Sequence, residues 1–141
     1  MTQPEAGEEL LESVDHAASL RLLAATDVGR MAVVVDGRPC IVVLNHLLDG
    51  EHVLFRTRAD AMLAGLTDDG HAVHAVYEVD SAFSPGRSGW SVIASGTLHR
   101  EADPTRVARA RDSIEAWAHG ERDTVLRLDV DELTGRRVGT V

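Results

Sequence analysis

The hydrophobic positions of the chain form one helical stretch, which is followed by short runs typical of β-strands. From Glu8 to about Thr26, apolar residues recur at helical spacing with charged residues between them. Gly29 follows this stretch at a position where a helix would end. The pattern therefore predicts one N-terminal helix before the first strand.

The next runs predict an antiparallel meander. Residues 31–35 are mostly β-branched, and Asp36-Gly37 after them is a strong hairpin signal. A second apolar run, residues 40–48, ends at the turn Asp49-Gly50, and a third strand begins at His52. Long apolar runs without clean alternation indicate strands covered on both faces, as in a closed barrel or at a subunit contact.

The second half of the chain predicts more strands and a second main helix. The expected elements are a short helix over residues 59–66, strands over 73–79 and 90–98, a helix over 105–117, and two final strands over 125–128 and 133–138. Asp103 and Pro104 suit the N-cap and the first position of the second main helix. Gly96 indicates a bulge or a close approach of another backbone segment. Six or seven strands with flanking helices predict an α+β domain, mainly antiparallel β, built on one barrel.

Length and charge narrow the class of protein. The 141 residues fit a flexible N-terminal leader, residues 1–9, and a single domain, residues 10–141. The chain has 14 Lys+Arg and 23 Asp+Glu, a net charge of −9. We therefore expect no broad binding to nucleic acid or to membranes, which requires a basic face. Because a signal-peptide pattern and a long apolar segment are both missing, we expect a cytoplasmic protein.

Several kinds of catalytic site have no counterpart in the sequence. Cys40 is the only cysteine, which excludes an internal disulfide and a thiolate metal cluster. His71 and His74 would point to opposite faces of a strand, so we expect no metal site. The fingerprints of serine hydrolases, P-loop enzymes and Rossmann dehydrogenases do not occur. No catalytic residue is identified.

A series of short motifs nevertheless has a characteristic order. The motifs are residues 28–33, 36–39, 43–46, 53–57, 89–92 with Gly96, 117–123 and 134–137. Together they resemble the pyridoxamine 5′-phosphate oxidase-like family of flavin-binding split-barrel proteins over about residues 20–138. The branch they resemble most is the actinobacterial group similar to nitroimidazole-resistance proteins. The resemblance implies a six- to seven-stranded split β-barrel homodimer that binds flavin mononucleotide (FMN) between its subunits.

The resemblance also implies a set of cofactor-binding residues. They are Val43, Leu44, Asn45, His46, Phe55, Arg56, Thr57, Met62, Trp90 and Ser91. Arg56 and Thr57 would contact the phosphate, for which a cationic fork and a hydroxyl are suited. The backbone of residues 43–45 would face the polar edge of the flavin ring. Trp90 would wall the ring or the dimer interface, and Ser91 would bond the phosphate or the ring from the partner chain.

Local sequence leaves structural interpretations open for these residues. Thr57, three residues before Asp60, has the form of a helix N-cap pair, and Arg56 would then be an ordinary surface arginine. Asn45 would cap a bulge while His46 points to solvent. Trp90 would be an anchor of the core or of the interface.

Two short stretches of the chain depart from the family pattern. Relatives usually carry a lysine where this chain has Met62, and Asp60 adds a carboxylate nearby. Loss of one charge-assisted contact, about 1.5–3 kcal/mol, weakens binding about tenfold or more. Thr124 and Val125 stand where relatives often have an aromatic residue. We therefore expect FMN binding to be weak, altered or lost.

The sequence thus leads to two functional hypotheses. The first is an FMN-binding, flavin-dependent oxidoreductase with a small-molecule redox substrate, in which the cofactor carries the chemistry. The alternative is a non-catalytic dimeric binding or carrier protein with a degenerate cofactor site. Its ligand would be a flavin, the deazaflavin F420 or haem.

Overall fold

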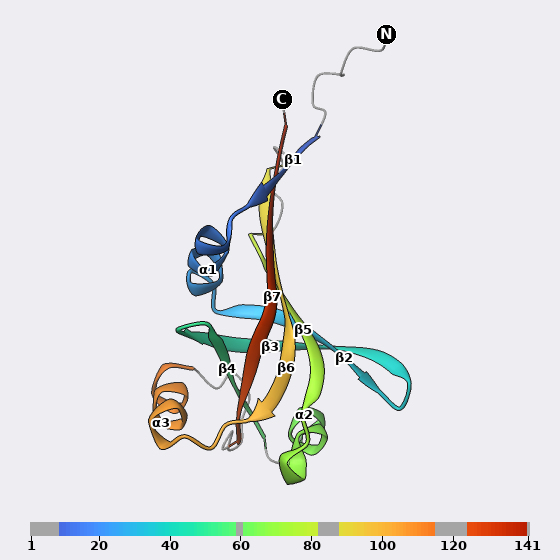
Figure 1. Ribbon diagram of the computed structural model, residues 1–141, viewed down its shortest axis with the longest axis vertical. Helices are drawn as coiled ribbons and strands as arrows, with labels where there is room; N and C mark the ends of the chain where they lie inside the picture. The colour runs from blue at the N-terminus through green and yellow to red at the C-terminus, as the bar shows by residue number, and fades with distance from the viewer. Residues whose placement is uncertain (1–8, 59–60, 82–87, 115–123, 141) are drawn as a thin grey trace.

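A computed structural model describes residues 9–58, 61–81, 88–114 and 124–140, with three α-helices and seven strands (Figure 1). The strands are β1 (Glu9–Val14), β2 (Val28–Val35), β3 (Arg38–Asp49), β4 (His52–Thr57), β5 (Val73–Asp80), β6 (Gly89–Arg100) and β7 (Thr124–Thr140). The helices are α1 (His16–Ala24), α2 (Met62–Leu66) and α3 (Pro104–Ser113), with a 3-10 turn η1 (Asp68–Gly70). Among the described helices, none has the length and apolar character needed to cross a membrane.

Six of the strands close into an antiparallel barrel. In the order β7-β4-β3-β2-β5-β6 each strand pairs with the next, and β6 pairs back with β7. The long strand β7 makes this closure possible, because its first residues pair with β4 while β6 accompanies most of its length. β1 adds a seventh strand along the last residues of β7. The predicted α+β split barrel is confirmed.

β3 changes neighbours along its length. Its residues 38–45 pair with β2, and its residues 46–49 pair with β4. β5 pairs only with residues 30–32 of β2, so the β2–β3 hairpin extends away from the barrel (Figure 1). Asp36 and Gly37 at its tip have φ of 51° and 76°, as a two-residue hairpin turn requires. The stretch 43–46 therefore lies where β3 passes from one neighbour to the other.

Aromatic and aliphatic side chains fill the barrel. Tyr77 and Phe55 are its largest fully buried side chains, and their rings meet edge to face with centroids 4.9 Å apart. Met31, Leu98 and Leu126, each fully buried, surround them in the same core. β2, β4, β5, β6 and β7 thus all contribute to one core.

The N-terminal helix is shorter than predicted. Residues 9–14 form β1 rather than the start of a helix, and α1 begins only after Asp15, whose carboxylate caps it by accepting from the Ala18 amide at 2.8 Å. A helical spacing of apolar residues was the only local signal, and the distant pairing with β7 overrides it. Gly29 lies inside β2, so its predicted role as a helix end is also wrong.

The C-terminal part also differs from the prediction. The two expected final strands are one continuous strand, β7, in which Asp129, Val130 and Glu132 remain paired with β6 while Asp131 is the extra residue at the bulge. The predicted bulge is confirmed, since the β6–β7 register shifts between Ser95 and Gly96. A Cβ atom on Gly96 would collide with the Asp129 carbonyl, so the bulge requires glycine.

Candidate functional site

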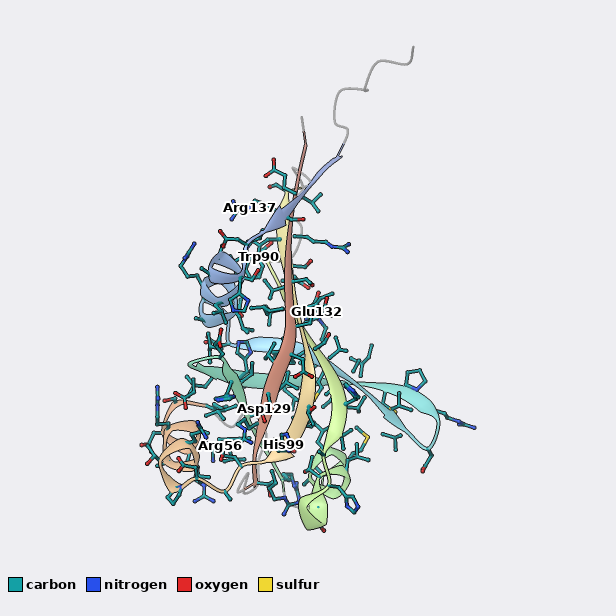
Figure 2. All side chains as sticks on the ribbon, in the orientation of Figure 1. Arg56, Trp90, His99, Asp129, Glu132 and Arg137 are labelled. Carbon is teal, nitrogen blue, oxygen red and sulfur yellow. The ribbon has the colours of Figure 1, made fainter. Side chains whose placement is uncertain are left out.

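Arg56 lies at the lower end of the barrel, beside α3 (Figure 2). It is the penultimate residue of β4 and pairs with Val125 of β7. Its guanidinium donates hydrogen bonds to two carbonyl oxygens at the end of α3, those of Arg111 at 3.1 Å and Ile114 at 2.7 Å. A cation is favourable there because the last carbonyls of a helix carry negative partial charge. Arg56 is therefore a half-buried, oriented cation rather than an ordinary surface arginine.

The other residues expected near the phosphate lie around the start of α2. Thr57 is the last residue of β4 and is buried, with 4% of its surface exposed. The N-cap of α2 is Ala61, so the interpretation of Thr57 as a helix N-cap is wrong. Met62, the first residue of α2, is exposed, whereas Phe55 is buried in the core. The strand end thus presents one oriented cation, and Met62 supplies no second charge.

The stretch 43–46 of β3 alternates between solvent and core. Val43 is 62% exposed, while Leu44 and His46 face the interior. Asn45 is half-buried. His46 is only 5% exposed, so the interpretation that it points to solvent is wrong. The period of two that places Leu44 and His46 on one face was visible in the sequence and would have predicted a core histidine.

Buried hydrogen bonds hold His46 in place. Its Nδ1 lies 2.6 Å from the Tyr77 hydroxyl, and its Nε2 lies 3.0 Å from the Leu23 carbonyl at the end of α1. The Tyr77 hydroxyl is also 3.1 Å from the Leu44 carbonyl. Burial lowers the pKa of His46, and it raises the pKa of Tyr77. His46 is thus a core residue that connects α1, β3 and β5.

Trp90 and Ser91 lie far from Arg56 within one chain. Trp90 is in the upper part of the molecule, where it pairs with Arg137, while Arg56 is near α3 (Figure 2). Trp90 is half-buried and packs against the barrel core, as the interpretation of it as an anchor expects. Ser91 follows it in β6 between Asp80 and Arg136. A single chain therefore does not bring the two ends of the expected cofactor site together.

The sequence did not predict an ionic cluster between the barrel and α3. Arg127 donates to both carboxylate oxygens of Asp129, at 2.8 and 3.2 Å, and to Glu101 at 3.0 Å. His52 and His99 reach the same Asp129 carboxylate, with shortest distances of 2.9 and 3.2 Å. Burial opposes the charge of Asp129, but Arg127, together with His99 and His52, favours that charge, and the pKa of Asp129 is lowered. The alternation that places Arg127 and Asp129 on one face of β7 is the only sequence signal of this cluster.

The cluster also bonds to the backbone at the start of α3. The side chain of Glu101 is almost fully buried, and it accepts hydrogen bonds from the backbone amides of Ala102 and Asp103 at 3.1 and 3.0 Å. Asp103 in turn is the N-cap of α3 and accepts from the Arg106 amide at 3.1 Å, as predicted. The cluster thereby fixes the start of α3, the helix whose other end binds Arg56. Residues 115–117 of the predicted helix lie outside the described residues.

An apolar surface covers the outer face of β3, β2, β5 and β6. Its large exposed side chains are Val34 (61%), Ile41 (73%), Val43 (62%), Val76 (39%) and Ile93 (38%). A shallow hollow of about 240 Å³ lies on this face, with Ala32, Val34, Pro39, His74, Val76 and Ser95 in its lining. We call the exposed side chains and the residues that line the hollow, taken together, the outer apolar face. The ion pair of Arg30 and Glu78 lies between Val43 and Ile93 on this face. Soluble monomers rarely leave large apolar patches exposed.

Comparison with known proteins identifies the family. The sequence profile described as Pyridoxamine 5′-phosphate oxidase matches residues 15–137. The uncharacterized protein Rv0080 of Mycobacterium tuberculosis is 32% identical over 137 residues, which cover 96% of this chain and 90% of that protein.

Two solved structures have the same fold. The FAD binding protein from Mycobacterium smegmatis has a TM-score of 0.72 and 25% identity, covering 89% of this chain and 96% of that one. The FAD and haem binding protein from the same organism has a TM-score of 0.63 and 15% identity, covering 92% of this chain and 72% of that one. The family resemblance inferred from the motifs is confirmed: the chain belongs to the pyridoxamine 5′-phosphate oxidase family.

Proposed function

We propose that this protein is a homodimer that binds a flavin nucleotide and acts as a flavin-dependent oxidoreductase on a small-molecule substrate. The observation that carries the proposal is the position of Arg56 and Thr57 at the end of β4, on a barrel of this family. A solved structure with 25% identity and the same fold is named an FAD binding protein. FMN, which the motifs imply, and FAD share the isoalloxazine ring, the ribityl chain and a phosphate.

Arg56 is the residue proposed to hold the phosphate. Its guanidinium is oriented by the two α3 carbonyls, so little side-chain freedom remains to be lost on binding. Arg58, exposed just beyond the end of β4, adds a second cation on that side. The same carbonyls carry negative partial charge, and Met62 adds no positive charge. This donor set fits a phosphate that is bound more weakly than by a chain with a lysine at position 62.

The stretch 43–45 of β3 is proposed to face the ring. Val43 is exposed and offers an apolar contact, while Asn45 is half-buried beside it. A flat aromatic ring needs such an apolar surface together with a few polar groups at its edge. A bound flavin would supply the electron and hydride chemistry, whereas the chain's own residues bind it, orient it and exclude water.

The outer apolar face is proposed as the contact between the two subunits. Val34 lies on the part of the β2–β3 hairpin that extends beyond β5, and Ile41 lies on β3 opposite Ala32; both are largely exposed, and a second copy would cover them. Trp90 and Ser91 lie far from Arg56 in one chain, so a partner copy is needed to bring these residues to the same cofactor. The homodimer therefore belongs to the same proposal as the cofactor site.

A non-catalytic carrier is the second candidate. Met62 in place of a lysine, and the carbonyl oxygens that bind Arg56, both favour a weakened phosphate site. A chain with such a site would bind a flavin, a deazaflavin or haem without turnover. One structure with the same fold is named an FAD and haem binding protein, so haem is included among the ligands to be tested.

Spectroscopic titration of the purified protein tests the proposal. We expect FMN or FAD to bind with quenched flavin fluorescence, at one flavin per subunit. We also expect the loaded protein to be reduced by a nicotinamide cofactor. Flavin binding without any reduction would favour the carrier. A Soret band with haemin and no affinity for either flavin would contradict the proposal.

A further inference from the structure

When the imidazole is neutral, His46 and Tyr77 together have fewer hydrogens to donate than the contacts around them require. Three contacts of bonding length join His46 Nδ1 to Tyr77, Tyr77 to the Leu44 carbonyl, and His46 Nε2 to the Leu23 carbonyl. Each contact needs one hydrogen. A neutral imidazole provides one N–H and the tyrosine one O–H, so only two of the three bonds can form together.

The acceptors decide which bond is missing. The Leu23 carbonyl can only accept, so a neutral His46 carries its hydrogen on Nε2, and Nδ1 is then an acceptor. The Thr26 hydroxyl does not change this, because it lies closer to the Leu23 carbonyl (3.0 Å) than to Nε2 (3.4 Å). The Tyr77 hydroxyl therefore donates to Nδ1 in the neutral state, and the Leu44 carbonyl receives no hydrogen from it.

Protonation of His46 reverses the direction of the hydrogen bond between His46 and Tyr77. An imidazolium donates from Nδ1 to the Tyr77 oxygen, and the Tyr77 hydroxyl is then free to donate to the Leu44 carbonyl. All three contacts are satisfied in that state. Leu44 is the middle residue of the stretch 43–45, so the change acts on the backbone of this stretch.

We propose that His46 and Tyr77 are a positioning pair for the ring-facing stretch of β3, in which a proton on His46 switches the Tyr77 hydroxyl from His46 to the Leu44 carbonyl. The inference rests on the proposed function, because it assigns the pair a role in flavin binding. Neither side chain has to touch the flavin, since both act through the backbone of β3.

The charged groups near the pair come from α1, β2 and β5. Asp27, which follows α1, accepts from the His46 amide at 2.9 Å through its carbonyl, and its negative charge favours the imidazolium. Arg30 of β2 and Glu78 of β5 flank Tyr77 with opposite effects on its pKa. β4 contributes Phe55, which is apolar. Burial outweighs these charges and lowers the pKa of His46, so the switch operates below the usual titration range of histidine.

Nuclear magnetic resonance of the histidine side chains in the flavin-free, full-length protein tests the network itself. At neutral pH we expect His46 to carry its hydrogen on Nε2, with Nδ1 as a hydrogen-bond acceptor. Tyr77→Phe should move the Nδ1 resonance of His46 and leave that of the exposed His71 unchanged. An Nδ1–H tautomer, or an unchanged Nδ1 resonance in the variant, would overturn the proposed switch.

The affinity for FMN, compared between wild type and Tyr77→Phe from acid to neutral pH, tests the positioning role. Ionisation of the FMN phosphate affects both proteins equally and cancels in the ratio of their affinities. We expect this ratio to change by about threefold or more as His46 titrates, the effect of one hydrogen bond. His71→Gln is the matched control, and its ratio to wild type should stay constant.

The NMR and affinity experiments together distinguish a failure of this inference from a failure of the proposed function. A Tyr77→Phe ratio that is independent of pH would overturn the positioning role, although flavin still binds. If wild type binds no flavin, the proposed function fails and the positioning role fails with it. The tautomer measurement in the flavin-free protein would in that case still decide whether the switch exists.

Discussion

The ring of Tyr77 occupies the space that a side chain at Gly29 would need. A Cβ atom built on Gly29 would lie 2.5 Å from Tyr77 Cζ and 2.6 Å from its hydroxyl oxygen, far inside van der Waals contact. It would also lie 2.5 Å from the Glu78 carbonyl oxygen. Because Gly29 pairs with Leu44 across the β2–β3 ladder, this gap lets the Tyr77 hydroxyl reach the Leu44 carbonyl.

Gly29→Ala is therefore expected to destabilise the fold. Neither the tyrosine ring nor the β5 backbone can move without disturbing the core, so we expect a loss of about 1–3 kcal/mol in the free energy of unfolding. Urea unfolding measures this loss. Gly65→Ala is the control, since a Cβ there meets nothing within 4 Å, and it should cost almost nothing. Equal stabilities of the two variants would contradict the tight packing at Gly29.

Stability should fall in acid because of His46. Burial lowers the pKa of this residue in the folded state, so the unfolded chain binds its proton first as the pH falls. The contribution of neutral His46 is fully present above its unfolded pKa of about 6.5 and is lost progressively below that value. Urea unfolding at several pH values measures the slope. His46→Gln should flatten it, whereas an unchanged slope would show that His46 is not responsible.

The sequence predicted the elements whose signals are local. The hairpin at Asp36-Gly37 and the helix start at Asp103-Pro104 depend on turn and cap chemistry, and both were predicted correctly. β1 could not be predicted, because residues 9–14 become a strand only through pairing with β7. Asp129, Asp131 and Glu132 interrupted the apolar pattern of β7, although pairing on both sides of the bulge keeps this stretch in the strand.

For the candidate site, the sequence pointed to individual residues, but it did not show which other residues they contact. Arg56 was assigned to the end of its strand correctly, but its bonds to α3 join residues more than fifty positions apart and leave no local signal. The alternation with Leu44 indicated the burial of His46, but its bonding partners Tyr77 and Leu23 belong to distant elements and left no local signal. The proposed roles in flavin binding remain predictions.

The outer apolar face should hold the dimer together. Ile41→Glu places a charge on its most exposed apolar residue, and burial of an unpaired carboxylate is costly. We expect this variant to shift from dimer to monomer in sedimentation velocity experiments. Ala24→Glu, on the exposed side of α1, is the control and should stay dimeric. A dimer that tolerates Ile41→Glu would place the subunit contact elsewhere.

Met62→Lys should strengthen flavin binding. Met62 is exposed at the start of α2, so a lysine there can reach a phosphate at the end of β4 without disturbing the core. One charge-assisted contact corresponds to an affinity for FMN about tenfold higher. Fluorescence titration measures it, and Met62→Gln controls for polarity without charge. If both variants bind like wild type, the phosphate does not lie near position 62.

The most direct test of the account is the affinity of Arg56→Ala for FMN, measured beside wild type and the control Arg21→Ala. Arg21 is exposed on α1, away from the proposed site, so its loss removes the same charge without touching the phosphate. The account predicts that Arg56→Ala binds FMN about tenfold or more weakly while remaining a folded dimer. It also predicts that Arg21→Ala binds like wild type. Equal affinity in all three proteins would contradict it.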